Sequence, residues 1–378
     1  MWLCSIPGLY REGKNALLRY FGSPEEIRNA PASAFEPWRK LGMSWAGRLA
    51  DPHSRELPPE AAPAKLKEKG IYFIDCESAS YPERLRELPD YPYGLFFKGS
   101  LPPEDCFHVA IVGARSCSSY GRAVAEELAA ALAARGDGIV SGMALGIDGF
   151  AQAAALAQGG NSYGVLGCGV DLCYPREHFA LYLRLSEQGG VISEFPPGTQ
   201  PLKMHFPIRN RLISGLADCV AVVEAREKSG SLITADLALD QGRDVYAVPG
   251  RCSDLLSRGC NRLIESGAQV LLSVEDFLEM TKEASDRKHK DARRNPQILS
   301  GTAGNRKADP GPGKKEWTDP EKKVLQTLDF TPADPGSLCR KTGLNAQELY
   351  NVLLKLQLSG EVREISRQMY VKTKLPKE

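Results

Sequence analysis

The chain has 378 residues and a mass of 41.3 kDa, which is too long for one ordinary domain and predicts two or three. Hydrophobic residues make up 42% of it and charged residues 25%, so a wholly disordered or collagen-like protein is excluded. The net charge is only +1, so overall basicity does not indicate a nucleic-acid partner, and any such site must be local.

The first 65 residues are helix-like and predict a small N-terminal helical domain. Asn15–Phe21 is apolar at helical spacing and is followed by Gly22, a helix stop. Ser23 and Pro24 then have the pattern of an N-cap and a first helical residue. Prolines at 58, 59 and 63 indicate the connection to the next domain.

Short apolar runs alternate with helical patterns over residues 66–281, which we expect to form one domain. Strands are expected at residues 107–113, 138–141, 163–167, 191–194, 218–223, 244–248 and 269–273. Helices are expected at residues 120–135, 148–158, 177–188, 207–216, 231–241, 261–266 and 274–280. Because the strands are continuously apolar, they predict a parallel sheet covered on both faces, a doubly wound α/β domain.

The last third of the chain predicts a linker and a winged helix. Residues 282–316 lose their periodicity and carry ten Lys and Arg against five Asp and Glu, so we expect a disordered basic linker. Residues 317–378 predict helices at 319–328, 334–342 and 346–358, then a hairpin at 360–371. Three short helices and a hairpin are the pattern of a winged helix.

The apolar runs, the N-terminus and the cysteines favour a cytoplasmic protein without membrane contact. Runs such as 109–112 and 219–223 are far shorter than the roughly 20 residues of a membrane span. Residues 1–14 do not combine a basic and an apolar segment as a secretion signal does. The ten cysteines contain no Cys-x-x-Cys pair, so we expect reduced thiols.

Small residues gather where the expected parallel strands end. In an open parallel sheet, ligands bind at this edge, where helix N-termini offer unpaired N–H groups to anions. One reading is that these glycines and serines only cap helices and turn corners. Their recurrence along one edge, with Arg115 among them, instead favours a phosphate-bearing ligand. The backbone groups expected to hold phosphate belong to Gly113, Ser141, Gly142, Ser229, Gly230 and Ser231.

The segment 201–211 is the sharpest local feature. Arg209, Asn210 and Arg211 follow Pro207 at a predicted helix N-terminus, where cations are unfavourable unless an anion offsets them. Phe206 adds a surface on which a base could stack, and Lys203 adds a further charge. The alternative is that the arginines pair with carboxylates of the chain itself, such as Glu194 or Glu224.

Arrangements for catalysis are poor. The chain has no Gly-x-x-x-x-Gly-Lys-Ser/Thr loop and no Gly-x-Ser-x-Gly motif, and its five histidines have no metal-ligand spacing. Carboxylates near strand ends (Asp148, Asp171, Glu194, Glu224) are more typical of helix caps or arginine partners. We therefore expect that the protein is not an enzyme and that it has no catalytic residue, metal or cofactor.

Seven short sequence motifs follow one another along the chain. They are Ala-Ile-Val-Gly-Ala-Arg at 110–115, Ser-Gly-Met-Ala-Leu-Gly-Ile-Asp at 141–148, Phe-Pro-Ile-Arg-Asn-Arg at 206–211, Val-Glu-Ala at 223–225, Ser-Gly-Ser-Leu-Ile-Thr-Ala at 229–235, Val-Pro-Gly at 248–250 and Ser-x-Gly-x-Asn-x-Leu-Ile at 257–264. Together they resemble the DNA-processing protein A family, DprA or Smf. The resemblance covers roughly residues 81–278.

The resemblance implies a Rossmann-like domain that binds single-stranded DNA without chemistry on it. It further implies a role in natural transformation and recombination, in which the protein protects incoming strands, loads the RecA recombinase and dimerises through this domain. The residues implied to bind DNA are Arg115, Lys203, Phe206, Arg209, Asn210 and Arg211. The N-terminal region is similar to a helix-hairpin-helix or SAM-like module of the family.

One residue departs from the family pattern, and two other functions stay open. Gln152 stands where the family commonly has a histidine. A nucleotide or nucleoside-phosphate hydrolase would use Asp148 or Glu224 as its acid or base. A transcriptional regulator would instead read duplex DNA through the winged helix.

Overall fold

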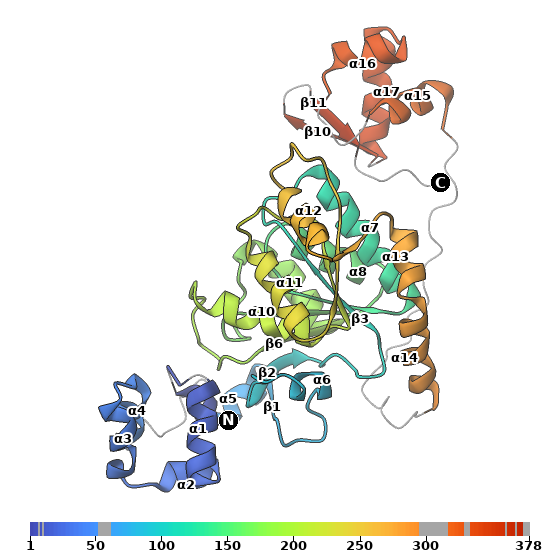
Figure 1. Ribbon diagram of the computed structural model, residues 1–378. Helices are drawn as coiled ribbons and strands as arrows, with labels where there is room; N and C mark the ends of the chain where they lie inside the picture. The colour runs from blue at the N-terminus through green and yellow to red at the C-terminus, as the bar shows by residue number, and fades with distance from the viewer. Residues whose placement is uncertain are drawn as a thin grey trace.

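The computed structural model describes residues 1–6, 8–9, 11–51, 62–294, 317–328, 333–359, 361–366 and 369–372. It shows a helical N-terminal part, a large α/β domain and a small C-terminal domain (Figure 1). No helix in the described ranges is long and apolar enough to cross a membrane.

A nine-stranded sheet forms the centre of the α/β domain, in the order β1-β2-β6-β5-β4-β3-β7-β8-β9. Neighbours from β6 to β9 pair in parallel, as the apolar runs predict, with β3 in the middle of this parallel part. These strands are β3 (His108–Val112), β4 (Gly138–Ser141), β5 (Ser162–Val165), β6 (Gly189–Ser193), β7 (Cys219–Val222), β8 (Asp244–Ala247) and β9 (Gln269–Val270).

Two strands that the sequence patterns did not predict extend the sheet. β2 (Gly94–Gly99) pairs antiparallel with β6, and β1 (Tyr72–Asp75) pairs antiparallel with β2. Their pairing partners define them more than their own composition does. The sheet is therefore mostly parallel with an antiparallel extension.

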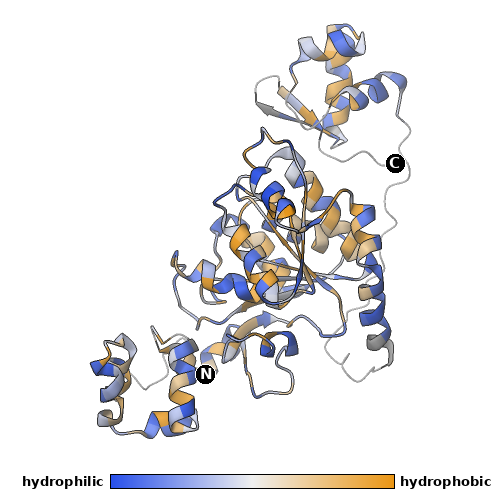
Figure 2. Cartoon of the chain, in the orientation of Figure 1, coloured by the Kyte–Doolittle hydropathy of each residue, from blue (hydrophilic) through white to orange (hydrophobic). Residues whose placement is uncertain are grey.

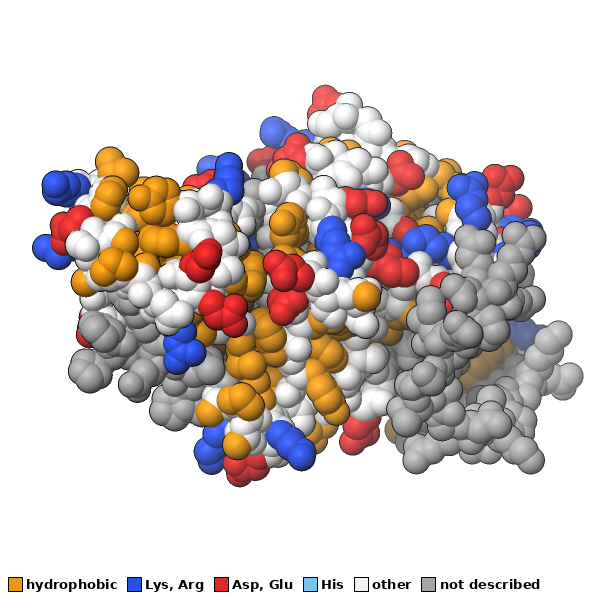
Figure 3. Space-filling view, turned by 90° about the horizontal axis from the view of Figure 1, so that it is seen from below, with side chains coloured by type: hydrophobic (Ala, Val, Ile, Leu, Met, Phe, Trp, Pro, Cys, Tyr) orange, Lys and Arg blue, Asp and Glu red, His pale blue; other side chains and the backbone are white. Residues whose placement is uncertain are grey.

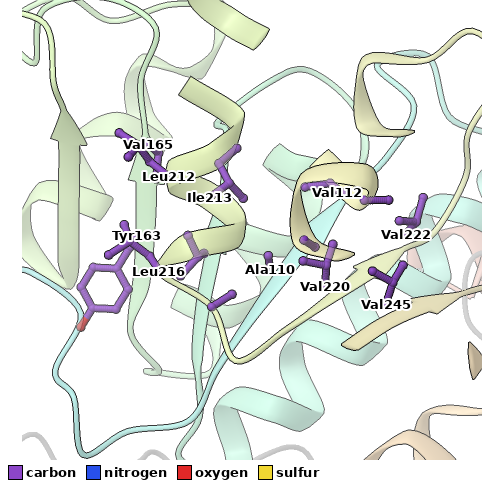
Figure 4. Close-up of a cluster of buried hydrophobic side chains, with 14 of the residues drawn as sticks. Ala110, Val112, Tyr163, Val165, Leu212, Ile213, Leu216, Val220, Val222 and Val245 are labelled. Atoms are coloured by element: carbon purple, nitrogen blue, oxygen red, sulfur yellow. The ribbon is translucent and has the colours of Figure 1, made fainter. Parts of the chain in front are cut away.

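Helices cover both faces of the sheet, which confirms the doubly wound architecture. One face carries α6 (Glu83–Arg86), α10 (His205–Gly215), α11 (Gly230–Asp240) and α12 (Arg258–Glu265). The other carries α7 (Ser119–Arg135), α8 (Ile147–Ala157), α9 (Phe179–Glu187), after the short turn η5 (Arg176–His178), and α13 (Val274–Met280). Figure 4 shows the first face, where Leu212 and Leu216 of α10 pack beside strand residues such as Ala110 and Val220.

The N-terminal part is a helical unit with its own apolar core. It comprises η1 (Trp2–Ser5), α1 (Arg11–Phe21), α2 (Pro24–Asn29), η2 (Ala32–Phe35), α3 (Glu36–Lys40) and α4 (Ser44–Ala50). The Ser23 Oγ accepts a hydrogen bond from the Glu26 N–H, so the predicted N-cap of α2 is confirmed. Cys4 packs with Leu66 of α5 (Pro63–Glu68) and Phe96 of β2, which joins this unit to the sheet domain.

The segment after α13 is helical where a disordered linker was expected. α14 spans Lys282–Arg294, and its fully buried Ser285 donates a hydrogen bond to Asp137 (2.7 Å). Lys288 reaches the Glu104 carbonyl oxygen (3.1 Å). The helix is hydrophilic throughout (Figure 2) and attaches through polar contacts, so apolar periodicity could not reveal it. Residues 295–316 of the expected linker lie outside the described residues.

The C-terminal part confirms the predicted winged helix. It contains α15 (Asp319–Thr327), α16 (Pro335–Thr342), α17 (Ala346–Leu358) and a hairpin of β10 (Val362–Ser366) and β11 (Met369–Lys372). Asn345 and Glu348 form a capping box that starts α17. Residues 360 and 367–368 of the expected hairpin lie outside the described residues.

Candidate nucleic-acid interface

A groove of about 680 Å³ lies at the carboxyl ends of the parallel strands, where a ligand of a doubly wound domain is expected. We call it the sheet-edge groove. It is lined by residues 112–116, Ala144, Asp148, Tyr174, Lys203, Phe206, Pro207, Arg209, Asn210, Ile213, Arg226, residues 228–231, Ile233, Thr234 and Leu256.

Four basic side chains of the groove have no acidic partner. Arg115, Lys203, Arg226 and Lys228 form no ion pair with any residue that the structure describes. Their charges therefore add up at one edge of a nearly neutral protein. Such a local positive potential attracts a polyanion, and phosphate groups are the common ligands of Arg and Lys in this arrangement.

Two aromatic rings share the groove with these charges. The ring centroids of Phe206 and Tyr174 are 5.5 Å apart at an interplanar angle of 34°. The Arg115 guanidinium carbon lies 5.7 Å from the Phe206 centroid, close enough for a cation–π contact. An aromatic surface beside basic groups is the arrangement that binds unpaired bases and their phosphates.

The N-terminus of α11 opens onto the same groove. Ser229 caps this helix and accepts a hydrogen bond from the Ser231 N–H. Asn210 donates from its side-chain amide to the Gly230 carbonyl oxygen (3.2 Å), which fixes α11 against α10. No atom lies within 4 Å of the place where a Cβ on Gly230 would stand, so a ligand can approach this backbone closely.

Arg209 lines the sheet-edge groove, but its guanidinium group donates hydrogen bonds to the protein backbone. It is 4% exposed, and its Nη1 donates to the carbonyl oxygens of Gly142 (2.8 Å) and Val165. Burial lowers the Arg209 pKa to about 10, an effect that the neighbouring Asp148 carboxylate opposes. The Arg209 Nη1 is thus engaged in hydrogen bonds that hold three segments of the fold together, and a DNA contact of this residue stays a prediction.

The backbone of the loop after β4 already binds a carboxylate of the chain itself, that of Asp148. The Gly142 N–H donates to the Asp148 carboxylate (3.0 Å), and the Ser141 Oγ donates to the Ile111 carbonyl oxygen (2.6 Å). Neither Ser141 nor Gly142 lines the groove. The expectation that these two residues bind phosphate is corrected accordingly, whereas Gly113, Ser229, Gly230 and Ser231 do lie at the groove.

Arg211 points away from the sheet-edge groove. It is 5% exposed and forms ion pairs with Asp90 (2.9 Å) and Glu194 (2.7 Å). Pairing with Glu194 is the alternative that the sequence left open, and the structure adopts it. The expected DNA contact of Arg211 is corrected, since α10 turns about 100° per residue and places residues 209 and 211 on different sides.

Of the predicted contacts, Arg115, Lys203, Phe206 and Asn210 come together at the groove. Sequence reasoning missed Tyr174, Arg226 and Lys228. The last two stand just before the capped N-terminus of α11, a position that signals an anion site. Nothing in the spacing of Tyr174 indicates that its ring meets Phe206.

The carboxylates considered for catalysis are both engaged in structural contacts. Glu224 accepts hydrogen bonds from the Ser118 N–H (2.8 Å) and the Ser118 Oγ (2.5 Å), at the N-terminus of α7. Burial raises the pKa of Asp148, while the Arg209 charge and the Gly142 N–H act in the opposite direction. Both therefore behave as the helix caps and arginine partners that the sequence favoured.

A doubly wound sheet with a basic, aromatic groove at its carboxyl edge and a separate winged helix defines a class of nucleic-acid-binding Rossmann-like proteins. The family model described as DNA recombination-mediator protein A matches residues 72–282, and the DprA winged helix domain matches residues 308–366. The chain therefore belongs to the DNA recombination-mediator protein A family.

Individual relatives agree with this membership. The DNA processing protein DprA of Bacillus subtilis (strain 168) is 43% identical over 217 residues, which cover 57% of this chain and 73% of the relative. Protein Smf of Escherichia coli (strain K12) is 45% identical over 215 residues, 57% of this chain and 58% of the relative.

Two solved structures share the fold. The X-ray structure of DprA from Streptococcus pneumoniae aligns with a TM-score of 0.55 at 34% identity and covers 70% of this chain and 96% of the other. DNA processing protein A from Helicobacter pylori, whose structure concerns a unique single-stranded DNA binding mode, aligns with a TM-score of 0.53 at 30% identity, over 57% of this chain and 97% of the other.

Proposed function

We propose that this protein binds single-stranded DNA in the sheet-edge groove and acts in recombination by protecting the strand and delivering it to the RecA recombinase. The observation that carries the binding is the combination, in one groove, of the Phe206 and Tyr174 rings with four cations that pair with no acidic residue in the described part of the chain. Cations alone would bind any polyanion. The rings select unpaired bases, whose faces a duplex conceals.

Binding without chemistry is part of the proposal. The two carboxylates considered as acid or base, Asp148 and Glu224, already accept hydrogen bonds from donors of the chain, which supports a non-enzymatic role. A base-release assay on a panel of nucleotides tests this point. Release that is lost in Glu224→Gln would contradict it and favour a hydrolase.

Delivery to RecA and dimerisation through the sheet domain rest on family membership. The family model that matches the chain is described as DNA recombination-mediator protein A. α11 also exposes Leu239, an apolar side chain outside the groove that a second copy would cover. Sedimentation over a concentration series tests the dimer, and RecA filament nucleation on strands covered by single-strand-binding protein tests delivery.

Fluorescence anisotropy with a labelled dT oligonucleotide and with its duplex form tests the binding claim. We expect tight, salt-sensitive binding of the single strand and much weaker binding of the duplex. Equal affinity for the two forms would mean that the rings do not contact bases. No binding at low salt would contradict the proposal as a whole.

A further inference from the structure

A second cavity, of about 600 Å³, lies on the other side of α10 from the sheet-edge groove. In the stretch 202–208, Lys203 and Phe206 line the groove, whereas Leu202, His205 and Ile208 line the cavity. Its opposite wall comes from the N-terminal helical unit. We call it the inter-unit cavity, and its volume is in the range of small-molecule sites.

Lys14 of α1 is the unusual residue of this cavity. It is 9% exposed and lines the cavity, yet no residue that the structure describes forms a hydrogen bond or ion pair with its ammonium group. A buried ammonium group without a partner is costly. Because Lys14 lines the cavity, a ligand bound there can supply the missing anion.

The other cation of the cavity is paired within the chain, although the Arg211 Nη1 and the Glu194 Oε1 are buried without a hydrogen-bond partner among the described residues. Arg211 is held by Asp90 and Glu194, and Glu12 is exposed to solvent. These three carboxylates would repel a ligand with several negative charges, such as a phosphate ester or a DNA strand. A ligand with a single acid group needs only Lys14.

The remaining walls are mostly apolar. Phe195 and His205 are stacked with their ring centroids 4.1 Å apart. The His205 Nδ1 lies 3.2 Å from the Gly167 carbonyl oxygen and therefore donates to it, which fixes the orientation of this ring. Apolar side chains complete the walls, from Ile6, Leu9, Leu202 and Ile208.

We propose that the inter-unit cavity binds a small organic monocarboxylate with an apolar body, its acid group on Lys14 and its body between Ile208 and the N-terminal helical unit. Among side chains in the cavity, only the Lys14 cation lacks a carboxylate of the described chain to balance it. The apolar walls reward burial of the body, and the excess of carboxylates excludes polyanions. This site is separate from the proposed DNA site.

Ligand-observed ¹⁹F NMR on the full chain tests the site. The probes are 4-fluorobenzoate, its neutral amide 4-fluorobenzamide and the cation 4-fluorobenzylamine. We expect the benzoate to bind best, and Lys14→Met to weaken it by about tenfold or more, because a charge-assisted contact is lost. Arg19→Met, which removes an exposed cation of the same helix, is the matched control and leaves binding unchanged.

A second variant separates the site from the stability of α1. Ile208→Phe fills the cavity from α10 and leaves Lys14 in place, so benzoate binding is lost while thermal unfolding shows an intact fold. Retained benzoate binding in Lys14→Met, or equal binding of amide and benzoate, overturns the proposal. The affinity of Lys14→Met for the dT oligonucleotide is expected to stay at the wild-type value. A failure of the proposed carboxylate site can therefore be distinguished from a failure of the proposed DNA site.

Discussion

The two edges of the central sheet both carry basic residues, but only the carboxyl edge leaves several of them without an acidic partner among the described residues. At the amino ends of the strands, Arg84 pairs with Asp218 (3.3 Å), and Arg135 pairs with Asp137 (2.5 Å). Lys288 of α14 also reaches Asp218 (3.5 Å). Aspartates placed just before β4 and β7 thus turn the cations of this edge into structural contacts.

At the carboxyl ends, Asp148 and Glu194 compensate Arg209 and Arg211, but the other cations of the sheet-edge groove have no carboxylate partner among the described residues. Arg115 and Lys203 illustrate this, since neither meets a carboxylate in the part of the chain that the structure describes. On the face shown in Figure 3, by contrast, Lys and Arg are scattered among acidic and apolar side chains. Unbalanced charge, more than the number of basic residues, therefore distinguishes a binding edge from a structural one.

Arg209 offers the largest expected effect, because it is a structural cation at the binding edge. Arg209→Met leaves Asp148 buried without its counter-charge, and we expect the free energy of unfolding to fall by about 3–5 kcal/mol. Urea denaturation followed by circular dichroism measures it. Arg226→Met, the matched exposed cation, changes stability by about 0.5 kcal/mol or less.

The double variant Arg209→Met with Asp148→Asn sharpens this prediction. Removal of both charges is expected to recover part of the lost stability, because the uncompensated carboxylate is gone. An Arg209→Met protein as stable as the wild type, with weakened DNA binding, would show that Arg209 belongs to the DNA site after all.

Phe206 comes next in size and tests the aromatic part of the groove. Phe206→Ala is expected to cost about 1–3 kcal/mol of binding free energy for dT, since one stacked base is lost. Phe179→Ala, an exposed phenylalanine of α9 outside the groove, is the control. Anisotropy titrations compare the two variants, and equal affinities would remove stacking from the account.

His108 gives a smaller, pH-dependent effect at the structural edge. It is fully buried, and burial lowers its pKa well below the ordinary value of 6.5, assisted by the Arg84 charge. The Nδ1 must accept from Arg84 Nη1 (2.9 Å), since a guanidinium only donates, so His108 is neutral in the fold.

Below pH 6.5 the unfolded chain therefore binds a proton that the native chain does not. Stability falls as the pH is lowered, by up to about 1.4 kcal/mol per pH unit more than in His108→Gln. Urea denaturation of both proteins from pH 7.5 to 5 measures the difference. Parallel curves would mean that His108 is protonated in the native state.

The parallel core was predictable because strands buried on both faces are continuously apolar, as 109–112 and 219–223 are. The start of α2 was predictable because Ser23 and Pro24 act locally. The strands β1 and β2 were not predictable from the sequence, because they depend on pairing with each other and with β6. The helix α14 was not predictable either, because it depends on polar contacts such as that of Ser285 with Asp137.

The site was predictable in its place but only partly in its residues. Strand ends and capped helix N-termini locate the edge, and Arg115, Lys203, Phe206 and Asn210 meet there. Sequence cannot tell which cations the fold neutralises, since the partners are remote. Asp148 lies 61 positions before Arg209, and Asp90 lies 121 positions before Arg211.

The salt dependence of dT binding tests the contrast between the two edges most directly. Anisotropy titrations over a salt series compare the wild type with Arg115→Ala/Lys203→Ala at the groove and with Lys282→Ala/Arg287→Ala on α14. The groove pair is predicted to make the negative slope of log affinity against log salt shallower by about 1.4, the value for two lost phosphate contacts on a single strand. The α14 pair is predicted to leave the slope unchanged. The reverse outcome, or equal losses from both pairs, would contradict the assignment of the strand to the carboxyl edge.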